Sequence, residues 1–314
     1  MMNKRSIVTV AVGKPYYLKL ALNLTRSFLL WHKNSELEFL LLTDNTAYFG
    51  EFANQPKVTI KKLNVSESEK SFTSKFLLIN HVEAEQNLFI DCDCLIYKPL
   101  DSIFDQMDFC DFTAIGKNQT GGTFFCDIPA TIKRFAIESM PTFVGSIYFF
   151  KNNDIARNIF AKAIELKAAY DELGFVRLRN KENEEPLFAV AMALYKQVPI
   201  ADNDMIKADL MYYKKWHTNV LKGEVDLYKF EGHQQVKNNP AIVHFNDKFS
   251  EGYQYLLDQL RLANPDRNQF ICNMKGWFVY QLPQKTRSLF KSWLRPLYHL
   301  LLGPSAVKNN KRIG

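Results

Sequence analysis

The sequence of 314 residues has no long hydrophobic segment, no internal repeat and no low-complexity linker. The apolar run at 7–12 has the length of a strand and is too short for a secretory signal core or a membrane span. The five cysteines form neither the paired spacings of a zinc knuckle nor a disulfide framework; they are Cys92, Cys94, Cys110, Cys126 and Cys272. We therefore expect a cytoplasmic protein with reduced thiols.

An excess of charge is also lacking over most of the chain. The formal net charge is +7, and residues 281–314 contain seven Lys or Arg and no Asp or Glu, which accounts for the whole excess. The first 280 residues are balanced, so we expect no nucleic-acid partner.

What the chain does contain is apolar material for a core. Hydrophobic residues make up 47% of the sequence, with 25 Phe and 14 Tyr. This composition excludes extensive disorder and is enough for one large core or two modest ones.

Hydrophobic patterning predicts an α/β protein with a mostly parallel sheet. Strands are expected at 6–12, 37–43 and 58–60, and a helix from Pro15 to Leu30 follows the first strand. These strands are almost continuously apolar, as in sheets that helices cover on both faces.

The later chain continues this pattern. Further strands are expected at 88–90, 109–115, 144–150 and 241–245, and helices at 71–82, 99–104, 153–173 and 186–194. The segment 116–142 has little periodicity and contains Gly121 and Gly122, so we expect a loop-rich region over a site.

Two carboxylates stand where the strand at 88–90 should end. Asp91 and Asp93 are two positions apart and so point to the same side of an extended chain. Carboxylates held this close favour a hard divalent cation between them, Mn²⁺ or Mg²⁺, which often shares its ligand shell with substrate phosphates. A polar strand end that faces solvent is the alternative.

The C-terminal region differs in character from the rest. Between 289 and 302, Leu, Phe, Trp and Tyr occur at helical spacing, and the charged residues among them are Lys and Arg only. This pattern is typical of a helix in a membrane interface, and the alternative is a helix docked on the protein with its lysines extended to solvent. We expect a catalytic domain at 1–250 and a helical extension at 251–314, either free in the cytoplasm or peripheral on the inner face of the cell membrane.

The motifs taken together resemble a known family. The segment 7–13 followed by Tyr17, Ala21 and Ser27, and the segment from Lys75 through Asp91 and Asp93 to Phe104, are similar to glycogenin-like and bacterial lipooligosaccharide galactosyltransferase-like enzymes. These are retaining, metal-dependent glycosyltransferases with the GT-A fold, a Rossmann-like, mostly parallel sheet flanked by helices. The resemblance covers about residues 1–250, and the basic, aromatic tail is similar in character only.

The resemblance implies a role for each matching residue. Asp91, Asp93 and His244 would hold the cation, although the family's pattern around the histidine lacks its Gly and Pro-Trp here. The nucleotide-sugar donor would be bound by residues of several segments: Val12, Gly13, Tyr17, Lys75, Cys92, Gly145 and Lys248. Cys92 is counted with the donor site only because it lies within the motif, and neither it nor Cys94 is expected to be a metal ligand.

Acidic residues complete the expected catalytic set. Glu184 and Glu185 open the helix near Pro186, where related enzymes present an acidic or amide group to the sugar, and the alternative is an ordinary favourable interaction with the helix dipole. With Asp91 and Asp93 they form the predicted catalytic residues. The expected reaction moves a hexose from a UDP-sugar to a saccharide or glycolipid, as in polysaccharide or lipooligosaccharide biosynthesis.

Three other functions stay open. A haloacid-dehalogenase-type phosphatase also places Asp-x-Asp after an apolar strand, but there the motif opens the domain and Leu95 occupies a position that prefers Thr or Val. A nucleotidyltransferase would need a glycine-rich basic loop after the first strand, where only Gly13 and Lys14 stand. A membrane-tethered protein that binds nucleotide sugars without turnover is the non-enzyme alternative.

Overall fold

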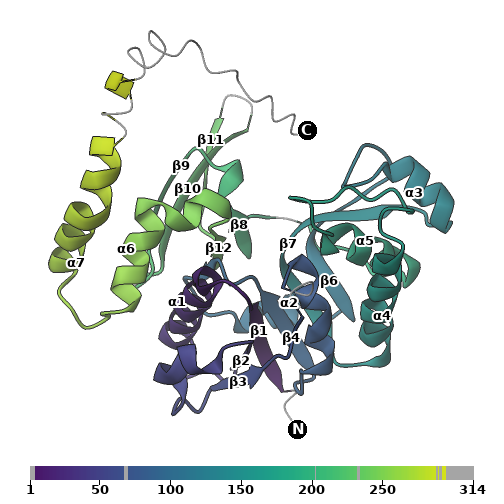
Figure 1. The fold of residues 1–314 in the computed structure, drawn as a ribbon, viewed down its shortest axis with the longest axis horizontal. Helices are drawn as coiled ribbons and strands as arrows, with labels where there is room; N and C mark the ends of the chain where they lie inside the picture. Colours follow the sequence, from purple (N-terminus) through teal and green to yellow (C-terminus); the bar gives the residue numbers. More distant parts are fainter. Residues whose placement is uncertain are drawn as a thin grey trace. The chain divides into compact units, whose positions relative to one another are not determined.

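The structure is a computed structural model that describes residues 4–66, 70–201, 203–231, 234–287, 289 and 292–294. The chain divides into two compact units, Met1–Ser250 and Glu251–Gly314 (Figure 1). The site described below lies within the first unit.

A six-stranded sheet forms the centre of the first unit, in the order β3-β2-β1-β4-β7-β6 (Figure 1). The strands are β1 (Arg5–Ala11), β2 (Glu38–Thr43), β3 (Val58–Lys62), β4 (Gln86–Ile90), β6 (Phe112–Gln119) and β7 (Met140–Lys151). Strands β1 to β4 pair in parallel, whereas β7 is antiparallel to both β4 and β6. The mostly parallel sheet predicted from the apolar runs is therefore confirmed.

Helices cover both faces of this sheet and bury its apolar side chains. They are α1 (Pro15–Trp31), η1 (Thr46–Phe52), η2 (Phe72–Asn80), α2 (Asp101–Met107), α3 (Ile128–Phe135), α4 (Asp154–Ala168) and α5 (Glu184–Leu194). One core joins the sheet to α1 and α2, and the other joins it to η2, α4 and α5. This two-sided burial explains why the strands carry apolar residues at successive positions.

A small second sheet, in the order β5-β12-β8, positions the candidate site. It consists of β5 (Cys94–Ile96), β8 (Lys207–Asp209) and β12 (Ile242–His244). Strand β12 pairs antiparallel with β5 and in parallel with β8, so His244 lies opposite both Cys94 and Asp209. Three segments far apart in sequence are thus joined directly after the Asp-x-Asp motif.

The remaining elements of the first unit are a short helix and a meander. The helix is η3 (Leu210–Tyr212), and the antiparallel sheet contains β9 (Lys215–Asn219), β10 (Glu224–Glu231) and β11 (Gln234–Asn238). The segment η4 (Asp247–Glu251) follows β12.

The second unit contains α6 (Tyr253–Leu262), α7 (Gln269–Gly276) and the π-helical turn η5 (Trp277–Gln281). Arg261 donates to Asp258 at 2.7 Å and to Asn273 at 3.0 Å, which ties α6 to α7. Several large apolar side chains of this unit are exposed, among them Phe270, Phe278 and Trp293. Within the described residues no helix is long and apolar enough to cross a membrane.

Two stretches differ from the sequence-based expectation. The segment 116–142, expected to be loop-rich, contains the end of β6, helix α3 and the start of β7. Residues expected as a helix at 71–82 form the 3₁₀ helix η2 instead. The predicted interfacial helix at 289–302 lies largely outside the described residues.

Candidate active site and metal centre

The Asp-x-Asp segment forms a tight turn between β4 and β5. The Asp91 amide donates to Ser146 O at 2.8 Å, and the Cys94 amide donates to Asp91 O at 3.0 Å. The Phe245 amide then donates to Asp93 O at 3.0 Å, which holds the turn against the end of β12. These backbone bonds fix where the two carboxylates can reach.

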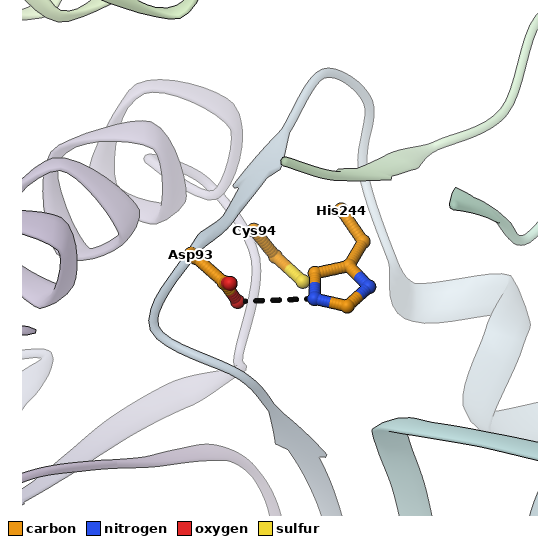
Figure 2. Close-up of side chains that lie close together, drawn as sticks. All are labelled: Asp93, Cys94 and His244. Carbon is orange, nitrogen blue, oxygen red and sulfur yellow. Dashed lines mark ion pairs between the residues drawn. The ribbon is translucent and has the colours of Figure 1, made fainter. Parts of the chain in front are cut away.

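Asp93 and His244, two of the residues predicted to hold the cation, lie close together. The distance from His244 Nε2 to Asp93 Oδ1 is 3.2 Å, and the side chains face each other across the turn (Figure 2). The Cys94 sulfur lies in the same group, since one ligand atom from each of Asp93, Cys94 and His244 falls within 4.8 Å of the others. Burial raises the pKa of the Cys94 thiol well above its usual value, which keeps it neutral.

The other ring nitrogen of His244 is held by a residue that the sequence did not single out. His244 Nδ1 lies 2.6 Å from Asp209 Oδ1, and Asp209 Oδ2 lies 3.2 Å from Lys207 Nζ, with all three side chains buried. Burial lowers the pKa of His244, but the charges and hydrogen bonds of Asp93 and Asp209 have a larger effect and raise the pKa to about 10. Burial raises the pKa of Asp209, but Lys207 and His244 together lower it to about 2.

Asp91 belongs to a second charged group, centred on the buried Lys75. The Lys75 ammonium donates to Asp91 Oδ2 at 3.0 Å, Glu184 Oε1 at 2.6 Å and Gly145 O at 2.7 Å. Burial alone would lower the pKa of Lys75, but the two carboxylates raise it above its usual value. Burial raises the pKa of Asp91 to about 6, although Lys75 acts in the opposite direction.

Helix α5 brings its first two residues, Glu184 and Glu185, to Lys75 and Gly145. Asn183 caps the helix by accepting from the Glu185 amide at 3.4 Å. Glu185 Oε1 accepts from the Gly145 amide at 2.7 Å, while Glu184 is buried against Lys75. Burial and the neighbouring Glu184 raise the pKa of Glu185 to about 7.

Gly145 is required by the closeness of these side chains. A Cβ atom at this position would collide with the Tyr148 hydroxyl and would lie 2.7 Å from Glu184 Oε1. The small residue therefore allows Lys75, Glu184 and Glu185 to converge on one backbone segment.

The predicted donor residues of the N-terminal segment lie at the carboxyl end of β1. Val12 is buried, and Gly13 has a φ of +86° and donates its amide to Asp44 Oδ2 at 3.0 Å. Tyr17, in the first turn of α1, is 39% exposed. Burial and the charges of the Asp91–Asp93 turn raise its pKa, and Cys92 in that turn is half-buried.

Lys248, the last of the predicted donor residues, lies in η4 after β12. Its side chain is exposed, with the ammonium 5.5 Å from the centroid of the Phe249 ring. Among the described residues it forms no hydrogen bond or ion pair with Asp93 or His244. The sequence missed Lys207 and Asp209, because a Lys-Ala-Asp triplet carries no motif and gains meaning only when β8 pairs with β12.

The residues at the turn fit a divalent cation. A carboxylate oxygen and an imidazole nitrogen are ligands that Mn²⁺ accepts, and Asp209 fixes the histidine with Nε2 directed to Asp93. A histidine oriented by a carboxylate on its far nitrogen is the usual arrangement around metal ligands. The predicted third ligand, Asp91, has one carboxylate oxygen, Oδ2, bound to Lys75.

Comparison with solved structures identifies the fold. The galactosyltransferase LgtC in complex with donor and acceptor sugar analogues matches with a TM-score of 0.50 and 14% identity over 77% of this chain and 87% of LgtC. The bifunctional glycosyltransferase WbbM matches with a TM-score of 0.51 and 12% identity over 88% of this chain. GlyE of Streptococcus pneumoniae TIGR4 matches with a TM-score of 0.44 and 15% identity over 64% of this chain.

The chain thus has the GT-A fold of glycosyltransferases, as the sequence resemblance predicted. It spans about half the length of the WbbM and GlyE chains, 52% and 46%. No protein-family model matches the sequence, and a search of curated proteins finds no significant relative.

Proposed function

We propose that the protein is a metal-dependent glycosyltransferase that moves a hexose from a UDP-sugar to a saccharide or glycolipid acceptor with retention of configuration. The observation that carries this proposal is the pairing of Asp93 with His244 beside the Lys75 group at the end of β4. The GT-A fold supports it, and retention rests on the family resemblance alone.

Asp93 and His244 would hold the cation, and Asp91 would complete its ligands through Oδ1, the oxygen that Lys75 does not engage. A divalent cation there would stabilise the negative charge that develops on the leaving diphosphate. Gly13 and Val12 at the end of β1, and Tyr17 on α1, would hold the nucleotide. Lys248 would contact a phosphate of the donor.

Lys75 has two roles in this proposal. Its ammonium fixes Asp91, Glu184 and the Gly145 carbonyl in one arrangement, so these groups need not reorganise when the donor binds. It also places a buried positive charge beside the position of the donor sugar. Glu184, which this charge holds, would accept a hydrogen bond from a sugar hydroxyl through Oε2.

Glu185 would act on the acceptor. The acceptor oxygen forms a bond to the anomeric carbon, the bond from that carbon to the diphosphate oxygen breaks, and its electron pair leaves with the nucleoside diphosphate. The acceptor hydroxyl loses its proton to Glu185. A carboxylate with a pKa of about 7 is well matched to take up a proton at neutral pH.

The test is to incubate the protein with Mn²⁺ and a panel of UDP- and GDP-sugars and to follow release of free nucleotide. Release of UDP that depends on metal and increases with a saccharide acceptor is expected, without phosphomonoesterase activity. Asp93→Ala should abolish it, while Asp226→Ala, which removes a carboxylate paired with Lys237 on β11, serves as the control. Full activity in Asp93→Ala would contradict the site.

The same assay separates the other functions. Metal-dependent binding of a UDP-sugar without hydrolysis or transfer would favour the non-enzymatic binder. Release of pyrophosphate from a nucleoside triphosphate would favour a nucleotidyltransferase.

We also propose that residues 285–314 associate with anionic membrane surfaces at the inner face of the cell membrane. The exposed side chains of Phe270, Phe278 and Trp293, in the same unit, support this proposal, as does the wholly basic charge of the tail. Deleting 285–314 should abolish sedimentation with vesicles rich in anionic lipid and leave UDP-sugar binding intact. Loss of donor binding in the truncated protein would contradict this role.

A further inference from the structure

A cavity of about 520 Å³ lies beside the paired strands β6 and β7. Its walls come from the segments 115–119, 142–144 and 207–212, together with Phe124 and Ala201. This volume is in the range of sites that hold small organic molecules. None of the residues predicted as site residues lines it.

The cavity adjoins both charged groups of the candidate active site. Val144 lines it and precedes Gly145, whose amide binds Glu185. Asp209 also lines it and holds the ring of His244. An acceptor hydroxyl must reach the anomeric carbon of the donor, so the acceptor has to be bound next to the cation and donor groups. Asp209, which lines the cavity and binds His244, gives the cavity a place next to the proposed cation site.

The lining suits a sugar ring. Phe124, Phe143 and Tyr212 provide aromatic surface, and Tyr212 is 60% exposed. A pyranose presents an apolar face of C–H groups, which packs on aromatic rings, and a rim of hydroxyls, which needs hydrogen-bond partners. Gln119 and Thr142, which are 2.9 Å apart and bonded to each other, provide such partners.

The charge of the lining is positive. Its charged residues are Lys117, Lys207 and Asp209, and the last two form a buried pair at 3.2 Å. Lys117 is exposed, and within the described part of the chain it forms no ion pair. A ligand in the cavity therefore meets one uncompensated ammonium and no uncompensated carboxylate, which favours an anionic group.

We propose that this cavity binds the terminal sugar of the acceptor and selects a sugar that carries an acidic substituent, a carboxylate or a phosphate, through Lys117. The inference rests on the proposed function. The sugar ring packs on Tyr212 and Phe124, and its acidic group lies toward Lys117.

The test uses three probes that differ in one substituent: methyl β-D-glucoside, its 6-phosphate and methyl β-D-glucuronide. Their dissociation constants are measured by ligand-observed NMR on the full chain with UDP and Mg²⁺, the diamagnetic alternative to Mn²⁺, present. At least one acidic glycoside should bind about tenfold more tightly than the neutral one, a difference of about 1.4 kcal/mol. Comparison of the phosphate and the glucuronide identifies which acid is preferred.

Variants assign the effect to residues. Lys117→Met should abolish the preference for the acidic probe and leave the neutral glycoside unchanged, and Tyr212→Ala should weaken all three probes. Lys133→Met on α3 and Phe109→Ala, an exposed aromatic before β6, are the matched controls and should change nothing. The salt dependence of acidic-probe binding should decrease in Lys117→Met.

Equal binding of neutral and acidic probes, a preference that persists in Lys117→Met, or no binding of any probe would overturn the proposal. Unchanged binding in Tyr212→Ala would show that the probes bind outside this cavity. These failures differ from failure of the proposed function, which would show as absence of metal-dependent nucleotide release in the separate assay. If acidic glycosides bind in the cavity but no nucleotide is released, the cavity assignment stands and the proposed transferase activity is contradicted.

Discussion

The two aspartates of the turn have opposite kinds of partner. Asp91 faces Lys75, a buried ammonium that already donates to three oxygens. Asp93 faces Nε2 of His244, whose other nitrogen is held by Asp209. A lysine has no lone pair to offer while it is charged, whereas a histidine can lose its proton and become a ligand.

We propose that this difference gives the two sides of the motif different tasks. On the Asp93 side the partner of the carboxylate can turn into a fellow ligand, so that side fits a cation. On the Asp91 side the partner remains a cation in its own right and fixes Glu184 and Gly145, so that side fits the donor sugar. The following predictions test whether the two sides are distinct in this way.

The largest expected effect is on the Asp91 side. Lys75→Met leaves Asp91 and Glu184 buried without their cation, so we expect the free energy of unfolding to fall by about 3–5 kcal/mol. Urea unfolding followed by circular dichroism at neutral pH measures it. Lys61→Met, which breaks the exposed pair with Glu83, should cost about 0–1 kcal/mol. Equal losses in the two variants would show that the buried group is not structural.

The next effect is on the Asp93 side. His244→Ala removes a proposed direct ligand, so Mn²⁺ affinity should fall by more than about 100-fold. This exceeds the loss usually seen when a residue that only hydrogen-bonds to a ligand is replaced. Titration of free Mn²⁺ by electron paramagnetic resonance measures this without any substrate. His217→Ala, an exposed histidine on β9, is the matched control. Unaltered Mn²⁺ binding would place the cation elsewhere.

A smaller loss of Mn²⁺ affinity is expected when Asp209, which binds the far nitrogen of His244, is replaced. Asp209→Asn should reduce Mn²⁺ affinity by about 10–100-fold, because the ring of His244 loses its charged partner. Since this also leaves Lys207 buried without a counter-ion, the double variant Lys207→Met/Asp209→Asn is measured beside it. Both should bind Mn²⁺ more weakly than Asp226→Asn, the control. A double variant with unchanged affinity would mean that Asp209 does not position the histidine.

The smallest effect depends on pH. The folded-state pKa of Glu185, about 7, is above the usual value of 4.5, so the folded state binds the proton more tightly than the unfolded state. The stability that Glu185 contributes is therefore complete below about pH 4.5 and is lost as the pH rises to 7.

The Glu185→Gln side chain does not ionise, so the variant does not lose stability at this position as the pH rises. Its melting temperature relative to the unsubstituted protein should rise between pH 4.5 and 7 and then level off, measured by differential scanning fluorimetry with EDTA present. Glu165→Gln, on the exposed face of α4, should show no such change. A difference that is constant with pH would contradict the raised pKa.

Much of the sheet could be predicted from the sequence, because most of its strands contain runs of apolar residues. The helix α1 could be predicted as well, since Pro15 opens it and Leu18, Leu24 and Phe28 recur on its buried face. Strands β5, β8 and β9 could not. All three are short, β8 and β9 are mixed in polarity, and only the strands beside them determine that they are extended.

The sequence by itself determined the Asp-x-Asp turn, since an apolar strand that ends in two carboxylates needs no distant partner to be recognised. The resemblance to a known family also indicated Lys75, Glu184, Glu185 and His244 as separate members of a site. Only the tertiary structure decided that Lys75 joins Asp91 to Glu184 while His244 joins Asp93 to Asp209. Each of these contacts spans a sequence separation that no local pattern encodes, and burial among neighbouring charges gives each group its ionisation state.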